Sequence, residues 1–186
     1  MTTRKSGEEV AYTVTFLEMT SRPGYAWPHT PGGMTGALLR AEDPPVWYFR
    51  ALYDAVGRDY AWTDLHASED TDIGEWLARK DVALYSLIDH GWPQGFFLLD
   101  WRAGDTCDLC YFGLVPSAVG RGLGNWMMRT AILTAWAREG MSKLIVNTCT
   151  LDHPRALIQY QKPGFTPVRQ EERTRVLTRD WTPAPN

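Results

Sequence analysis

The sequence predicts one α/β domain (α+β class) in which helices flank a mixed, mostly antiparallel central sheet of about six or seven strands. Segments 81–88, 94–101 and 105–115 are rich in β-forming residues and are separated by short turns, which is typical of an antiparallel meander. The third segment then runs through a glycine-rich turn and a long apolar helix into another strand, 143–150. This order predicts a parallel strand pair joined by a right-handed crossover. A length of 186 residues suits a single domain, 1–186.

The remaining elements follow from the same kind of pattern. Residues 12–19 alternate as a first strand, and the Pro- and Gly-rich segment 22–44 is expected to be an irregular loop. His29 in this loop is either solvent-exposed or a substrate contact. The chain ends, 1–9 and 182–186, are expected to be loose. Helices are expected over 44–57, over 70–80 and after a cap at Asp152 or His153, and a last strand is expected over 165–177.

Composition argues against several classes of function. A net charge of −3 gives no basic footprint for nucleic acid or for an anionic membrane. No apolar run has the length of a membrane span, and the first residues lack the apolar stretch of a signal peptide. We therefore expect a cytoplasmic protein. Cys107, Cys110 and Cys149 are an odd number without a completing Cys or His pair, so we expect ordinary thiols and no metal site.

The stretch from Asp108 to Asn125 carries the strongest functional signal. Gly120, Gly122 and Gly124 leave the backbone bare at every second position, where a ligand can approach closely. Because the turn opens a helix, several N–H groups lack intrahelical partners and lie at the positive end of the helix dipole. Such a turn is a ready site for phosphate or pyrophosphate. A Rossmann dinucleotide site is an alternative, but it needs G-x-G-x-x-G and an acidic residue after the next strand.

Two motifs resemble those of the GCN5-related N-acetyltransferase (GNAT) family. The run Val119-Gly-Arg-Gly-Leu-Gly124 is similar to motif A, Q/R-x-x-G-x-G/A, and departs from it only at Val119. The run Ala156-Leu-Ile-Gln-Tyr-Gln-Lys-Pro-Gly-Phe165 is similar to motif B, A-x-x-L-Y-x-K-x-G-F, with Gln159 in place of Leu. The resemblance covers residues 80–170 and implies the GNAT fold, in which a splayed pair of parallel strands binds acetyl-CoA.

The resemblance also implies roles for individual residues. Tyr160 matches the tyrosine that donates a hydrogen bond or proton to the leaving sulfur, and Asp108 matches the carboxylate that serves many members as general base, directly or through a water. An exposed strand-end aspartate is the alternative for Asp108. Contacts to the coenzyme are expected from Leu114, Val115, Val119, Gly120, Arg121, Gly122, Leu123, Gly124, Asn125, His153 and Tyr160. The acceptor site is expected to be lined by Trp47, Tyr48, Tyr60 and Trp62, unless these aromatic residues belong to the core.

The activity implied by the resemblance is the transfer of an acetyl group from acetyl-CoA to a primary amine of a small molecule or peptide. A non-catalytic acyl-CoA-binding or sensing module on the same fold is the main alternative. A nucleotide-dependent oxidoreductase is a third hypothesis, which the glycine spacing disfavours. Because GNAT members are often dimers, a homodimer is also expected. In that family the acceptor is selected by variable N-terminal helices and loops, so the motifs do not name the amine.

Overall fold

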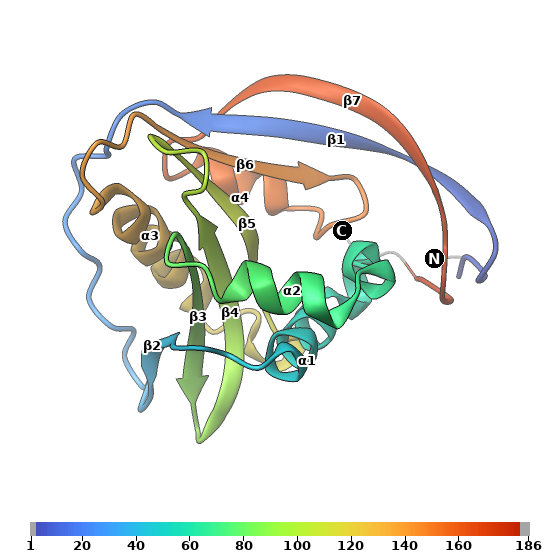
Figure 1. The fold of residues 1–186 in the computed structure, drawn as a ribbon, viewed down its shortest axis with the longest axis horizontal. Helices are drawn as coiled ribbons and strands as arrows, with labels where there is room; N and C mark the ends of the chain where they lie inside the picture. Colours follow the sequence, from blue (N-terminus) through green and yellow to red (C-terminus); the bar gives the residue numbers. More distant parts are fainter. Residues whose placement is uncertain (1–2, 183–186) are drawn as a thin grey trace.

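The computed structural model describes residues 3–182, which form one seven-stranded sheet flanked by helices (Figure 1). The strands are β1 (Glu9–Met19), β2 (Ala37–Ala41), β3 (Val82–Asp89), β4 (Trp92–Asp100), β5 (Thr106–Leu114), β6 (Lys143–Cys149) and β7 (Thr166–Val176). The helices are α1 (Val46–Gly57), α2 (Asp70–Leu77), α3 (Leu123–Trp136) and α4 (Ala156–Gln161). Short 3₁₀ turns cover Arg58–Tyr60, Asp64–Ala67 and Pro116–Ala118.

The sheet is mixed, with one parallel pair among the described strands. Its order is β2-β3-β4-β5-β6-β1-β7, and β5 and β6 run parallel while the other neighbours are antiparallel. Helix α3 connects β5 to β6, as the crossover rule requires for parallel strands. The predicted mixed, mostly antiparallel sheet with a parallel pair is therefore confirmed.

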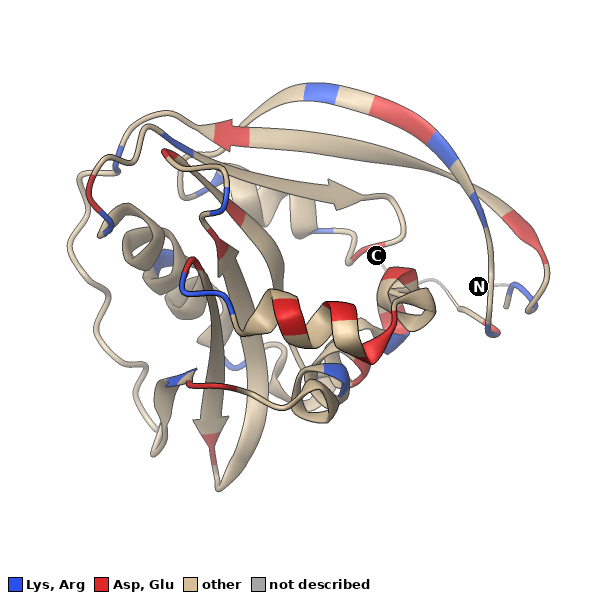
Figure 2. Ribbon diagram, in the orientation of Figure 1, with Lys and Arg blue, Asp and Glu red and all other residues tan. Residues whose placement is uncertain are grey.

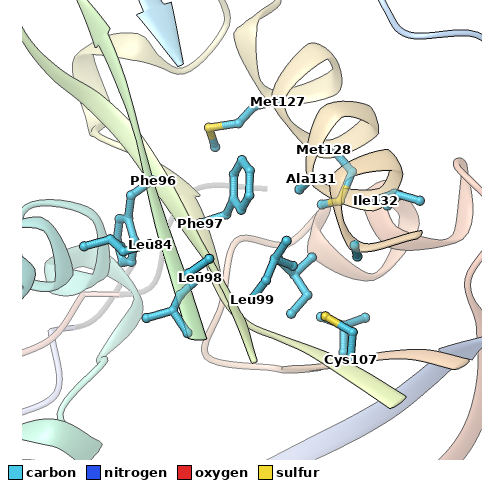
Figure 3. Close-up of a cluster of buried hydrophobic side chains, with 14 of the residues drawn as sticks. Leu84, Phe96, Phe97, Leu98, Leu99, Cys107, Met127, Met128, Ala131 and Ile132 are labelled. Atoms are coloured by element: carbon cyan, nitrogen blue, oxygen red, sulfur yellow. The ribbon is translucent and has the colours of Figure 1, made fainter. Parts of the chain in front are cut away.

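Strand β4 lies at the centre of the hydrophobic core because both of its faces are covered. Phe97 and Leu99 point toward α3, where Met127 and Ile132 pack against them, whereas Phe96 points to the opposite face (Figure 3). There Phe96 meets Phe49 of α1 edge-on, with ring centroids 6.1 Å apart. A strand buried on both faces has an unbroken apolar run in its sequence, and the run Phe96–Leu99 is of this kind. The apolar residues around α3 are buried for the same reason.

A two-residue turn joins β3 to β4. His90 and Gly91 both adopt left-handed backbone conformations, with φ of 54° and 83°. This is the combination that a tight hairpin turn needs to match the twist of its strands. The hairpin expected between these segments is confirmed, and Asp89 pairs with Trp92 across it.

The predicted irregular loop over 22–44 is wrong at residues 37–41, which form the edge strand β2. These residues pair antiparallel with β3 on one side, and this backbone pairing holds the strand although it buries little. Leu39 is 53% exposed, and the segment therefore lacks the apolar alternation by which a strand is recognised. Gly36 precedes it because a Cβ there would lie 1.7 Å from the carbonyl oxygen of Ile88.

The first strand of the chain lies deep in the sheet, between β6 and β7. Residues 14–19 of β1 pair with β6, and residues 9–18 pair with β7. Before β1, Arg4 exchanges backbone hydrogen bonds with Trp181 at 2.8 and 2.9 Å, and Lys5 forms an ion pair with Asp180. The segment 3–9 is thus paired rather than loose as predicted, because the end of the chain returns beside it. Residues 1–2 and 183–186 of the two predicted loose ends lie outside the described residues.

Charged residues of both signs are distributed over the fold. Figure 2 shows Lys and Arg alternating with Asp and Glu along β7, while α2 carries acidic residues. Within the described residues, no helix has the length and apolar character needed to cross a membrane.

Candidate active site

A cleft opens where the parallel strands β5 and β6 separate. The two strands pair over three positions only, and the last pair is Asp108 with Ile145. Beyond this point their C-terminal halves diverge around a cavity of about 630 Å³. Its walls include residues 109–114 of β5 and 147–149 of β6. Its ends are closed by the glycine-rich turn, by α4 and by parts of β1 and β7.

The β5 wall has an irregularity at the start of the cleft. Leu109 pairs with Leu99 and Tyr111 with Leu98, so Cys110 between them has no partner on β4 and forms a β-bulge. A bulge bends the strand and redirects the groups that follow it. The Val115 N–H donates to the Gln94 carbonyl on β4 at 2.9 Å. Since successive residues of a strand direct their backbone groups to opposite edges, those of Phe112 and Leu114 face the cleft.

The glycine-rich turn forms the end of the cleft at the start of α3. Gly120 and Gly122 have positive φ values of 86° and 78°, and a Cβ at either position would meet no atom within 4 Å. Helix α3 begins directly after Gly122, and no side chain caps it. Its first N–H groups therefore have no intrahelical acceptor and lie at the positive end of a helix of 14 residues. This arrangement suits a phosphate or pyrophosphate group.

The structure places the residues of the turn in two groups. Val119, Gly120, Gly122, Gly124, Asn125 and, from the preceding strand, Leu114 line the cleft. The side chains of Val115 and Leu123 are buried in the core, so these two residues offer the cleft backbone groups at most. Arg121 points away from it: its guanidinium donates to Asp89 at 2.9 Å and to Gln94 at 3.1 Å. Arg121 thereby ties the turn to the β3–β4 hairpin.

Tyr160 reaches the cleft from α4. Its ring lies edge-on to Phe112 of β5 at 6.4 Å and to Phe165 at 6.0 Å, which fixes its orientation. Burial raises the pKa of the Tyr160 phenol well above its usual value, and the negative charges of Asp152 and Asp108 add to the effect. The phenol therefore keeps its proton at neutral pH and is a hydrogen-bond donor.

Asp108 lies at the point where β5 and β6 part, although its side chain is absent from the lining of the cleft. It stands opposite Asp100, whose carboxylate accepts from Trp76 of α2 at 2.9 Å, so both face the α1–α2 side of the sheet. Burial, followed by repulsion from Asp100, raises the pKa of Asp108 to about 6. One of its oxygens is buried without a hydrogen-bond partner. Asp108 is therefore partly buried and not fully exposed.

Asp152 and His153 bring the far end of β6 together with the segment after α1. Neither caps α4, which begins at Ala156 without a capping side chain, so that prediction is wrong. The Asp152 carboxylate instead accepts the Cys149 N–H at 2.8 Å and the Trp62 indole N–H at 3.1 Å. His153 Nδ1 accepts the Arg155 N–H at 3.1 Å. Burial and then the Arg155 charge lower the pKa of His153, so its ring is neutral, and its proton is assigned to Nε2.

Of the four aromatic residues expected at the acceptor site, two line the cleft and two lie outside it. Tyr60 and Trp62 line the cleft, and Tyr60 lies edge-on to His153 at 6.1 Å. Trp47 and Tyr48 lie outside it. The Tyr48 hydroxyl donates to Ser86 at 2.9 Å, and Trp47 is 70% exposed. The structure therefore places Tyr60 and Trp62 together in the cleft, whereas Trp47 and Tyr48 lie elsewhere.

Several cleft residues carried no recognisable signal in the sequence. Tyr12 from β1 and Arg173 and Arg175 from β7 line its outer end. Arg175 donates to Asp64 at 2.6 Å and to the Ala61 carbonyl at 2.8 Å, and so holds the segment after α1 over the sheet. These residues meet only because β1 and β7 pair beside β6, an arrangement that local patterns do not specify.

Cys107 is buried, and Cys110 and Cys149 are partly buried. Cys107, Cys110 and Cys149 are all free thiols. Burial raises the pKa of Cys149, which borders the cleft, to about 12, so it is protonated at neutral pH. Within residues 3–182 no cluster of three or more His, Cys, Asp or Glu side chains is arranged to hold a metal ion.

No protein-family model matches the chain, and no curated protein matches it. Solved structures do. A GCN5-related N-acetyltransferase from Kribbella flavida is 18% identical, covers 87% of this chain and 56% of its own length, and superposes with a TM-score of 0.58. A GCN5-related N-acetyltransferase from Sphaerobacter thermophilus gives 16% identity, 98% and 55% coverage and a TM-score of 0.56.

A third match is an aminoglycoside acetyltransferase from an uncultured soil metagenomic sample, in complex with sisomicin. It is 10% identical, with 69% of this chain and 87% of the other covered and a TM-score of 0.55. The chain spans between 54% and 65% of the length of the first five matching structures. At these identities the likeness concerns the fold. The chain has the fold of the GCN5-related N-acetyltransferases, as its two motifs predicted.

Proposed function

We propose that the protein is an N-acetyltransferase that uses acetyl-CoA to acetylate a primary amine of a small molecule or peptide. The observation that carries the proposal is the convergence of three features on one cleft. These are the open edge of β5, the uncapped start of α3 after two glycines with positive φ, and the Tyr160 phenol. When bound, acetyl-CoA would supply an activated acetyl thioester.

The cleft fits an elongated coenzyme that carries a pyrophosphate. Gly120 and Gly122 leave open space beside the backbone, where a Cβ would meet no atom within 4 Å, and the free N–H groups of α3 would bind the negative charge in this cradle. Phe112 and Leu114 offer unpaired backbone groups along the β5 edge, which can bind an extended, amide-containing arm as a strand would. The volume of about 630 Å³ lies within the range of small-molecule and cofactor sites.

Two side chains can move the protons that amide formation requires. The Asp108 carboxyl, with a pKa of about 6, is largely ionised at neutral pH. Because its side chain does not line the cleft, it would take a proton from an ammonium group there through a bridging water. Tyr160 keeps its proton and can donate it to a developing negative charge in the cleft. Asp108 lies on β5 and Tyr160 on α4, so the group that accepts a proton and the group that donates one are on different elements of the fold.

Binding is tested first by thermal stability with acetyl-CoA, CoA or NADH. A ligand at a hundred times its dissociation constant stabilises the fold by about 2.7 kcal/mol, which raises the melting temperature by several degrees. Gly124→Glu introduces a negative charge into the cradle and should abolish the shift with both CoA ligands. Ala103→Glu is the control for the added charge, because Ala103 is exposed in the β4–β5 turn and lines neither this cleft nor any other cavity near the turn.

Catalysis is tested by release of the CoA thiol with a panel of primary amines. Stabilisation by acetyl-CoA together with thiol release would support the proposal. Binding without release across the panel would favour the acyl-CoA-binding module. Stabilisation by NADH alone would favour the oxidoreductase. Size-exclusion chromatography of the same samples tests the expected homodimer.

A further inference from the structure

A second cavity adjoins the cleft at the first turn of α3. It measures about 450 Å³ and lies between this turn and the β1–β2 loop. Gly122 and Asn125 line both cavities, so the two spaces meet at the proposed pyrophosphate cradle. A molecule held at the cradle by its pyrophosphate can therefore extend in two directions.

Aromatic and cationic side chains line this second cavity. Trp27 and His29 come from the loop, and Trp126 and Arg129 come from α3. Trp27 is 50% exposed, so part of its indole ring is open to a ligand in the cavity. Among the described residues, no Asp or Glu lines the cavity. No carboxylate of these residues forms an ion pair with Arg129, so the positive charge of the Arg129 guanidinium is not neutralised within the fold.

Two buried polar atoms beside the cavity lack partners. The guanidinium of Arg129 lies 4.2 Å above the Tyr25 ring, and neither the Arg129 Nε nor the Tyr25 hydroxyl has a hydrogen-bond acceptor or donor in reach. Buried groups of this kind are almost always satisfied in folded proteins, and an absent ligand is one reason for an exception. Stacking on Tyr25 holds the guanidinium in place.

We propose that this cavity binds the 3′-phosphoadenosine end of the coenzyme, with Trp27 stacking on the adenine and Arg129 pairing with the 3′-phosphate. The inference rests on the proposed function and deepens it. A purine needs a flat aromatic partner, a phosphate monoester needs a fixed cation, and both are present here without a competing carboxylate. His29 is within the same lining and adds a second donor.

The test compares three ligands by isothermal titration calorimetry: CoA, 3′-dephospho-CoA and S-acetyl-4′-phosphopantetheine. Arg129→Gln should weaken CoA about tenfold and leave the other two unchanged, because only CoA carries the 3′-phosphate. Trp27→Ala should weaken both CoA and dephospho-CoA at least about fivefold and spare the phosphopantetheine compound, which has no base. Arg138→Gln and Trp92→Ala are matched controls, since neither residue lines the cavity.

Distinct results would overturn the inference. Unchanged affinities in both variants would exclude the cavity, and an equal loss for all three ligands would mean that the variants merely disturb the α3 turn. Circular dichroism melting curves identify a variant that has unfolded. If Arg129→Gln unfolds, Arg129→Lys replaces it, because lysine keeps the positive charge but lacks the planar donor geometry of the guanidinium. Arg129→Lys should lose part of the preference for CoA over 3′-dephospho-CoA. Adenosine 3′,5′-bisphosphate separates the two proposals. If it binds in an Arg129-dependent manner while acetyl-CoA does not, the nucleotide site stands and the acetyltransferase falls.

Discussion

The partly buried carboxyl of Asp108 makes the sharpest prediction about stability. Its pKa rises from 3.8 to about 6 because burial and Asp100 disfavour its charge. The folded state therefore holds a proton more tightly than the unfolded state, and stability falls as the pH rises through the window from 3.8 to about 6. By linkage, a pKa displaced this far destabilises the fold by about 3 kcal/mol at neutral pH. Asp108→Asn removes this penalty.

The comparison of the two proteins across pH isolates the effect of the charge. The contribution of the amide itself is the same at every pH, so only the difference between variant and wild type is informative. This difference should increase in favour of the variant by about 2.5 kcal/mol between pH 4 and pH 7.5 in urea unfolding. The melting temperature of the variant should correspondingly gain about 5–10 °C relative to wild type over the same range.

Asp105→Asn is a control of opposite sign. The Asp105 carboxylate accepts a hydrogen bond from the Ser142 hydroxyl at 2.6 Å, and this bond lowers its pKa. Its loss should therefore destabilise the protein more at neutral than at acid pH. Parallel stability curves for wild type and Asp108→Asn would refute the reasoning. If Asp108 is also the general base, the variant should lose amine acetylation while it gains stability, and wild-type kcat/KM should decline below about pH 6.

Three further variants test the cleft. Tyr160→Phe should lower kcat about 100-fold with little change in CoA affinity, because it removes a proton donor and not a binding surface; an unaltered kcat would exclude this role. Gly122→Ala forces a side chain into a left-handed conformation with φ of 78°, so unfolding should become easier by about 1 kcal/mol and CoA binding should weaken; equal stability and affinity would contradict it. Trp62→Phe removes the 3.1 Å hydrogen bond to Asp152 and should lower the melting temperature by about 2–4 °C with a raised KM for the amine; an unchanged KM would place the acceptor elsewhere.

The sequence predicted best those features that depend on contiguous residues. The turn at Gly120–Gly124 could be recognised because a close backbone approach and a helix start need glycines at fixed offsets. The burial of α3 was visible in its apolar residues, and the hairpin at His90–Gly91 in its short connection. Strand β2 was missed because an exposed edge strand is held by backbone pairing and requires no apolar alternation.

The residues that meet across the sheet could not be predicted in this way. Asp152 looked like a helix cap from its position before Pro154, but its oxygens bind Cys149 and Trp62. Arg121 was expected to contact the coenzyme because of its position in the turn, but its guanidinium pairs with the buried carboxylate of Asp89. Arg121 pairs with a residue 32 positions earlier, and Asp152 bonds to Trp62, 90 positions earlier, and to Cys149 at the end of β6. Neither side chain is therefore free for the role that its place in the sequence indicated.

The two ends of the cleft differ in how far apart in the sequence their residues lie. The cradle is built from one continuous stretch, so its chemistry follows from a short motif. The outer end is assembled by β1, the segment after α1 and β7, and Arg175 joins Tyr12 to Asp64 across separations of 163 and 111 residues. A change in any of these three segments alters the outer end while the cradle stays intact. The proposed coenzyme cradle can thus be predicted from a short motif, whereas the proposed acceptor end of the cleft depends on long-range packing and its occupant has to be measured.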